Sequence, residues 1–188
     1  FPSRTEFLKT IPIFFLIASS FSPRQYSNIL TSPAVFSKMV HKILIVVDMQ
    51  KDFVDGSLGT KEAQSIVPAV KDKIENFEGD IIFTKDTHEE DYLNTQEGRN
   101  LPVVHCIRGT AGHEIIEELQ PYTKRALAIF EKETFGSRKL AGFLKELHKE
   151  KKIESIELIG LCTDICVVSN ALLIKAFLPE VPISVTAG

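Results

Sequence analysis

"KILIVVD", residues 42–48, is the stretch that decides the fold, because five consecutive aliphatic residues run directly into an aspartate. A run of Ile, Leu and Val without polar alternation is typical of a parallel strand that is buried on both faces. Four later runs have the same character and lie at residues 80–86, 126–132, 153–160 and 181–185. The sequence therefore predicts a mainly parallel sheet of five strands.

The segments between these runs have the hydrophobic spacing of helices. Helices are expected at residues 62–76, 113–119, 137–150 and 163–178. The segment 137–150 is amphipathic, with Leu140 and Leu144 on its apolar face and Lys139 and Lys145 on the other. Strands that alternate with helices indicate an α/β domain whose sheet is covered by helices on both faces.

Length and charge limit the classes of function. A chain of 188 residues with 44% hydrophobic content is the size of one domain. The net charge of −3 is scattered along the chain, which gives no reason to expect nucleic acid or a membrane as partner and favours a small molecule. A homo-oligomer is left open. Three cysteines cannot form a closed set of disulfides, so we expect a reduced, cytoplasmic protein.

The first 38 residues differ in character from the predicted domain. Basic residues precede the apolar stretch at 11–21, which has the length of a signal-peptide core. Against a targeting segment, "MVHKILIVVDMQ" resembles a natural start at Met39 that enters the first strand at once. We expect residues 1–38 to be a dispensable or non-native extension and residues 39–188 to form the domain.

The residues that end the predicted strands carry unusual chemistry. Open α/β sheets bind ligands outside the carboxyl ends of their strands. Asp48 ends the first strand, Asp86 the second and Lys132 the third, and the fourth runs into Cys162 and Cys166. An acid, a base and a thiol at one edge of a sheet indicate a catalytic site.

"GLCTDICVVSNAL", residues 160–172, contains two cysteines that differ in their setting. Thr163 is expected to cap the following helix, which places Cys166 in the first turn, where the helix dipole favours a thiolate. Buried cysteine is the ordinary alternative for both. Asp48 is well placed as a general base, although it could be a solvated acid, and Lys132 could extend to solvent.

A metal site is a second hypothesis. "DTH" puts Asp86 and His88 on the same side of an extended chain, and with His105 they form a set suited to zinc, iron or manganese. A histidine pair without metal is the alternative. The long polar segment 87–112 lies between these residues, and long connections in compact domains often have a function.

Four stretches together resemble the isochorismatase-like cysteine hydrolases, and most closely the nicotinamidases among them. They are "LIVVDMQKDFVDGSL", "IIFTKDTHEEDYLNTQEGRNLPVVHCIRGTAGHEI", "FEKETFGS" and "IGLCTDICVVSNAL", and they span residues 44–172. The resemblance implies a Rossmann-like three-layer sandwich. It also implies a further helix and strand beyond the fifth strand. The sequence ends at Gly188, so we expect an uncovered sheet edge.

The resemblance assigns roles to the strand-end residues. It implies a catalytic triad of Asp48, Lys132 and Cys166, with Cys166 as the nucleophile. The backbone N–H groups of Cys162 and Cys166 would form the oxyanion hole, and the peptide bond from Leu161 to Cys162 would be cis.

The metal set is extended by the same resemblance to Asp86, His88, Glu97 and His105. Many members have a histidine where this chain has Asn94, and others use a glutamate, which Glu97 matches either directly or through a water molecule. The implied cofactor is a divalent metal ion, zinc before iron or manganese.

Phe53 and Phe135 match aromatic positions of the substrate pocket, although both could equally pack in the core. The expected reaction is the hydrolysis of nicotinamide to nicotinate and ammonia in NAD salvage, through a thioester on Cys166. The alternatives are a cysteine hydrolase for another small amide or carbamoyl compound, and a non-catalytic member of the fold.

Overall fold

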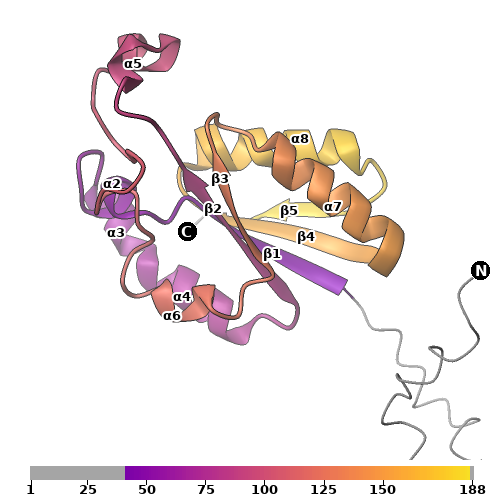
Figure 1. Ribbon diagram of the computed structural model, residues 1–188. Coiled ribbons are helices and arrows are strands. Elements are labelled where there is room, and N and C mark those ends of the chain that lie inside the picture. Colours follow the sequence, from indigo (N-terminus) through magenta and orange to yellow (C-terminus); the bar gives the residue numbers. More distant parts are fainter. Residues whose placement is uncertain (1–40, 187–188) are drawn as a thin grey trace, which may run out of the picture. The chain divides into compact units, whose positions relative to one another are not determined.

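The structure is a computed structural model that describes residues 41–186. The expectation for residues 1–38 lies outside the described residues. The sheet contains five parallel strands, β1(His41–Val47), β2(Asp80–Asp86), β3(Ala128–Lys132), β4(Ile153–Gly160) and β5(Ile183–Val185), in the order β3-β2-β1-β4-β5 (Figure 1). The predicted parallel sheet is confirmed, although β3 and β5 each begin two residues later than expected.

The helices agree with the sequence only in part. The structure contains α2(Lys51–Val54), α3(Lys61–Ser65), α4(Val67–Asn76), η3(Tyr92–Asn94), α5(Gln96–Asn100), α6(Gln120–Thr123), α7(Arg138–Lys151), η4(Thr163–Val167) and α8(Val168–Phe177). The predicted helix at 62–76 is divided at Ile66 into α3 and α4. Pro68 lies in the first turn of α4 and supplies no backbone donor, so α4 begins anew there.

The helix expected at 113–119 is wrong. Ile115 forms an antiparallel bridge with Gln50, and Lys51 donates its backbone N–H to Glu114 O at 2.9 Å. The Ile116 N–H likewise donates to Met49 O at 3.0 Å. These bonds to a segment more than sixty residues earlier replace the local bonds that a helix would need.

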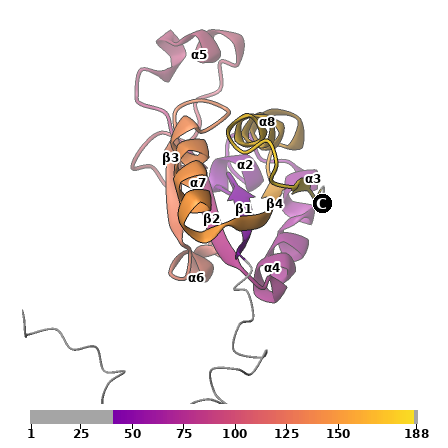
Figure 2. The same ribbon diagram turned by 90° about the vertical axis from the view of Figure 1, so that its right-hand side faces the viewer.

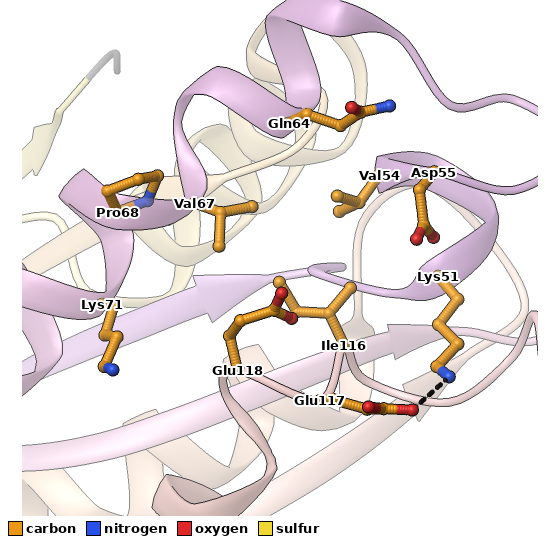
Figure 3. A pocket seen from close by; sticks show the side chains of 10 residues that line it. All are labelled: Lys51, Val54, Asp55, Gln64, Val67, Pro68, Lys71, Ile116, Glu117 and Glu118. Carbon is orange, nitrogen blue, oxygen red and sulfur yellow. Dashed lines mark hydrogen bonds and ion pairs between the residues drawn. The ribbon is translucent and has the colours of Figure 1, made fainter.

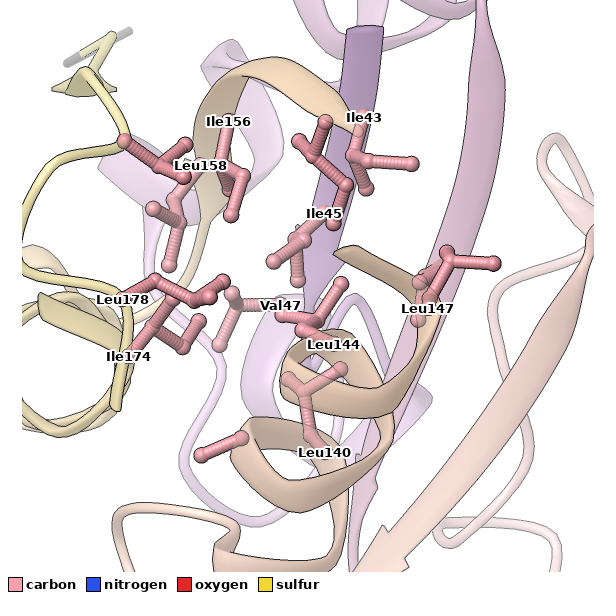
Figure 4. Close-up of a cluster of buried hydrophobic side chains, with 14 of the residues drawn as sticks. Ile43, Ile45, Val47, Leu140, Leu144, Leu147, Ile156, Leu158, Ile174 and Leu178 are labelled. Carbon is pink, nitrogen blue, oxygen red and sulfur yellow. The ribbon is translucent and has the colours of Figure 1, made fainter. Parts of the chain in front are cut away.

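The two faces of the central strand pack into two separate layers of core. Ile43, Ile45 and Val47 pack with residues of α7 and α8 (Figure 4), whereas Leu44 and Val46 pack with residues of α4. Figure 2 shows α4 apart from α7 and α8. All five side chains are completely buried. Burying an aliphatic side chain of this size contributes about 1.5–3 kcal/mol, so both helical layers are held firmly on β1. This is the predicted three-layer α/β sandwich.

The segment after β2 leaves the body of the domain before it returns to β3. It carries η3 and α5, and α5 projects beyond the carboxyl ends of the strands (Figure 1). The segment returns alongside its own start, because His88 N donates to Cys106 O at 3.0 Å and Arg108 N donates to His88 O at 2.9 Å. This pairing places His88 next to residues 105–108.

Candidate active site

Asp48, Asp86 and Cys166 all contact the buried ammonium group of Lys132. Lys132 Nζ lies 2.7 Å from Asp48 Oδ2 and 3.4 Å from Cys166 Sγ. The same nitrogen lies 2.9 Å from Asp86 Oδ1. All four residues are at most 5% exposed. The arrangement joins an acid, a thiol and a cation across β1, β3 and η4.

The backbone at the end of β1 turns sharply and aims the Asp48 carboxylate into this cluster. Asp48 has a φ of +48°, in the left-handed region that few non-glycine residues adopt. Thr84 of the neighbouring strand holds the carboxylate by donating to Asp48 Oδ1 at 2.7 Å. Burial raises the pKa of Asp48, and the attraction of Lys132 only partly offsets that effect. A raised pKa suits a group that must accept and return a proton.

Cys166 lies on a π-helical turn, η4, that precedes α8. The expectation that Thr163 caps a regular helix is wrong: Cys162 occupies the cap position, and no side chain makes a capping bond. Burial, together with the Asp48 carboxylate, raises the pKa of the Cys166 thiol. These effects favour the protonated thiol, and the Asp48 carboxylate beside it can accept its proton.

Lys132 keeps its charge despite burial. Desolvation alone would lower the pKa of this amine, but Asp48 and Asp86 outweigh it and raise the pKa. A permanent cation between two carboxylates and a sulfur stabilises whichever of them carries the negative charge.

The backbone before Cys166 agrees with the expected pattern. The peptide bond between Leu161 and Cys162 is cis. Within residues 41–186 the Cys162 N–H donates no hydrogen bond to the backbone, and the Cys162 side chain is exposed. This N–H is therefore available to a ligand.

Four side chains with metal-binding chemistry gather beside the triad. One ligand atom from each of Asp86, His88, Glu97 and His105 lies within 4.8 Å of the others. Asp86 comes from the end of β2 and Glu97 from α5, while the histidines come from the paired segments around residues 88 and 105. All four residues predicted as ligands are thus brought together.

The donor set fits a divalent metal ion. His105 Nδ1 lies 2.7 Å from the Val103 carbonyl oxygen, which requires a proton on Nδ1, so in the neutral ring the lone pair is on Nε2. His88 Nε2 is buried and has no hydrogen-bond partner in the described part of the chain, although Asp86 Oδ2 lies 2.9 Å away. Two imidazole lone pairs and two carboxylates suit zinc, iron or manganese.

The two predicted aromatic residues lie in different settings. Phe53, on α2, is half-buried, and its ring centroid lies 5.4 Å from that of His105. Phe135 lies between β3 and α7, is 44% exposed, and has its carbonyl bound by Asn170 at 3.0 Å. Phe53 therefore lies beside the His105 ring, whereas the backbone of Phe135 is linked to that of Cys166 through Asn170.

The sequence did not indicate two residues that support the metal-binding group. Tyr92 is 1% exposed and packs against both histidine rings, at 4.5 and 5.0 Å between centroids. Gln50 is fully buried and forms two bonds to the Asp86 backbone, accepting from N at 2.7 Å and donating to O at 2.8 Å. The only sequence signal for Gln50 was its position, as a polar residue two places after the strand-end Asp48.

A separate hollow of about 660 Å³ lies between α2, α3, α4 and residues 116–118 (Figure 3). Lys51 and Glu117 form an ion pair across it at 3.0 Å. It contains no thiol or imidazole, so it is not the site of the predicted chemistry. The residues that line it are Lys51, Val54, Asp55, Gln64, Val67, Pro68, Lys71, Ile116, Glu117 and Glu118.

With this geometry established, the comparisons with known proteins identify the family. Residues 42–181 match the isochorismatase domain, and the chain belongs to that family. An uncharacterized isochorismatase family protein, PncA of Bacillus subtilis, is 35% identical over 144 residues, covering 69% of this chain and 76% of that protein. A nicotinamidase of Acinetobacter baylyi is 26% identical over 159 residues, covering 69% and 72%.

Solved structures share the fold. N-carbamoylsarcosine amidase from Thermoplasma acidophilum is 28% identical with a TM-score of 0.64, and the match covers 78% of this chain and 82% of that one. Pyrazinamidase of Pyrococcus horikoshii, solved in complex with zinc, is 25% identical with a TM-score of 0.59, covering 79% and 99%. The family and these relatives indicate an enzyme of the amidohydrolase class.

Within the described residues no helix is both long and apolar enough to cross a membrane.

Proposed function

We propose that the protein hydrolyses nicotinamide to nicotinate and ammonia, with Cys166 as nucleophile and a divalent metal ion beside it. The contact network that supports this proposal runs through Lys132, which touches Asp48, Cys166 and the metal-binding Asp86 with one nitrogen. A nucleophile and a ring-binding metal at neighbouring positions suit a substrate whose amide is attached to a pyridine ring.

The first half of the reaction forms a thioester. Asp48 takes the thiol proton as Cys166 Sγ attacks the carboxamide carbon, and the electron pair of the carbonyl moves to oxygen. The backbone N–H groups of Cys162 and Cys166 hold that oxygen, an effect worth about 3–4 kcal/mol for each donor. Asp48 then gives its proton to the leaving nitrogen, and ammonia departs.

The second half releases the acid. Asp48 takes a proton from water, the hydroxide attacks the thioester carbon, and the carbon–sulfur bond breaks. The proton returns to Cys166, and nicotinate leaves. Lys132 stays charged throughout and stabilises the thiolate and the carboxylate in turn.

Asp86, His88, Glu97 and His105 would hold the metal ion, with zinc as the first choice. Such an ion supplies a coordination position for the pyridine nitrogen and so orients the ring. Phe53 and Phe135 would line the pocket on either side. The three cysteines are free, which supports a reducing, cytoplasmic setting. Hydrolysis of nicotinamide in that setting would serve NAD salvage.

Ammonia release from nicotinamide by the purified protein tests the proposal. The assay compares the native protein with Cys166→Ala and with a chelated sample, and then adds zinc, iron or manganese back. We expect activity to disappear in both and to return with one of the metals. Retained activity in Cys166→Ala would contradict the assigned nucleophile.

A second candidate is the hydrolysis of a carbamoyl compound, which the structural likeness to N-carbamoylsarcosine amidase favours. The same triad could attack a ureido carbon, so the triad does not separate the two reactions. The metal-binding group does, because a carbamoyl substrate needs no ring coordination. Ammonia released from N-carbamoylsarcosine but not from nicotinamide, without dependence on metal, would favour this candidate. No release from either compound by a folded, metal-loaded sample would indicate a non-catalytic member of the fold.

A further inference from the structure

Asn170 is a buried polar residue on α8 for which the proposed reaction has no role. It is 0% exposed and lies within the first turn of the helix, where an apolar residue would pack more easily. Asparagine is among the weaker helix formers, and burying an amide costs free energy unless it is hydrogen-bonded. Its presence therefore needs a compensating set of contacts.

The contacts of Asn170 join the nucleophile to the loop that carries Phe135. Asn170 Nδ2 donates to the Cys166 carbonyl oxygen at 2.8 Å and to the Phe135 carbonyl oxygen at 3.0 Å. Asn170 Oδ1 accepts from the Ser137 N–H at 2.9 Å. Both amide protons and the carbonyl are thus used, and one side chain ties together two segments about thirty residues apart.

The loop between β3 and α7 runs close to the backbone of α8 at the same point. A Cβ atom added at Gly136, between the two residues that Asn170 binds, would lie 3.2 Å from the Ser169 carbonyl oxygen. Ser137 also begins α7, because its side chain accepts from Leu140 N at 3.1 Å. Asn170 therefore holds the loop against α8, and the chain continues from the loop directly into α7.

We infer that Asn170 is a positioning residue. It sets the distance between the Cys166 sulfur and the Phe135 side chain, which forms one wall of the substrate pocket (the Phe135 wall), and so selects amides attached to a flat ring. The inference rests on the proposed function, since it assumes that Phe135 lines the substrate pocket. We expect the Cys166 sulfur to stay in place without Asn170, because Lys132 contacts it and the η4 turn carries it.

Steady-state kinetics with Asn170→Ser tests the inference. The smaller hydroxyl cannot make all three bonds, so the Phe135 loop loosens while the triad remains. We expect KM for nicotinamide to rise about tenfold and kcat to change less than about threefold. A variant that merely loses stability would lower the active fraction, and thus kcat, with KM unchanged, which would overturn the inference.

Two variants make the test specific. Phe135→Ala should raise KM on its own, and adding Asn170→Ser to it should have little further effect, because both act through the same wall. Full additivity of the two effects would contradict the inference. Asn76→Ser is the matched control: Asn76 also donates to the carbonyl four residues earlier in its helix, at 2.9 Å, but it is exposed on α4. It should leave KM and kcat unchanged.

Alkylation of Cys166 separates this inference from the proposed function. The rates with iodoacetamide and with its bulkier N-benzyl derivative are followed by mass spectrometry of the Cys166 peptide, which needs no turnover. We expect Asn170→Ser to raise the relative rate of the bulky reagent severalfold, even if native protein leaves nicotinamide untouched. An unchanged ratio of the two rates would overturn the inference.

Discussion

The triad and the metal-binding group meet at Asp86 but are built in different ways. Asp48, Lys132 and Cys166 come from the ends of β1 and β3 and from η4, three separate segments that the sheet brings together. Three of the four proposed metal-binding residues, His88, Glu97 and His105, come instead from the single excursion between β2 and β3.

This difference determines what each group depends on. The triad geometry follows from strand register and from the two buried core layers, so it depends on the fold of the whole domain. The metal-binding geometry follows from a few local contacts, chiefly the bonds between residues 88 and 106–108 and the packing of Tyr92. We therefore expect substitutions in the triad to change chemistry or global stability, and substitutions in the metal-binding group to change metal loading first.

The largest expected effect is that of Cys166→Ala. Removing the proposed nucleophile should lower kcat by about 10⁴-fold or more, because the proposed covalent attack then has no sulfur to make it. The folded state should be as stable as before, within about 1 kcal/mol, as measured by chemical denaturation.

Cys162→Ala is the control for the nucleophile, since it removes an exposed thiol and keeps the backbone N–H. Ammonia release should stay within about threefold of the native rate. Equal losses in the two variants would mean that the two cysteines have been assigned wrongly.

Lys132→Met should have the next largest effect, and it should depend on pH. Without the ammonium, Asp48 and Asp86 face each other uncompensated, and the free energy of unfolding should fall by about 3–5 kcal/mol. The pKa of Asp48 is already raised by burial and loses the lowering effect of Lys132. The native variant then holds a proton that the unfolded chain releases, so its stability falls as pH rises above the ordinary Asp value of 3.8.

Denaturation at about pH 5 and about pH 8 measures this dependence. The deficit of Lys132→Met should be larger at the higher pH, and an equal deficit at both would show that Asp48 is not the group left uncompensated. Lys149→Met is the control, because its ion pair with Glu146 is exposed and should contribute less than about 1 kcal/mol.

His105→Ala should act on metal content before it acts on the fold. Loss of one imidazole should weaken metal binding by more than about 100-fold, since removing even an outer partner of a ligand costs 10–100-fold. Elemental analysis after dialysis measures the metal per chain. His148→Ala on α7, away from the group, should keep its metal. Full metal content in His105→Ala would remove this residue from the ligand set.

Tyr92→Phe should have the smallest effect. It keeps the ring that packs on His88 and His105 and removes the hydroxyl that donates to Leu101 O at 3.0 Å. One such bond contributes about 1 kcal/mol, so metal affinity should fall less than about tenfold. Competition with a coloured chelator measures it. A larger loss in Tyr92→Phe than in Tyr92→Leu would contradict a packing role for the ring.

The sequence predicted the sheet well because burial on both faces leaves few residue types for a central strand. It also predicted which residues would meet, because the carboxyl ends of parallel strands share one edge. It failed at 113–119, where the periodicity of a helix was present but backbone bonds to Met49 and Lys51 replaced the helical ones. No local pattern reports a partner so far away in the chain.

The sequence by itself determined the α/β class, the five strands and the set Asp48, Asp86, His88, Lys132 and Cys166, since each follows from residue type and position along the chain. Only the tertiary structure decided how these side chains are held: Gln50 on the Asp86 backbone, Tyr92 against two imidazoles, Asn170 between the carbonyl groups of Cys166 and Phe135. The physical reason is that a buried polar or aromatic side chain takes its role from its contacts. Those contacts join residues that only the folded chain brings within a few ångströms.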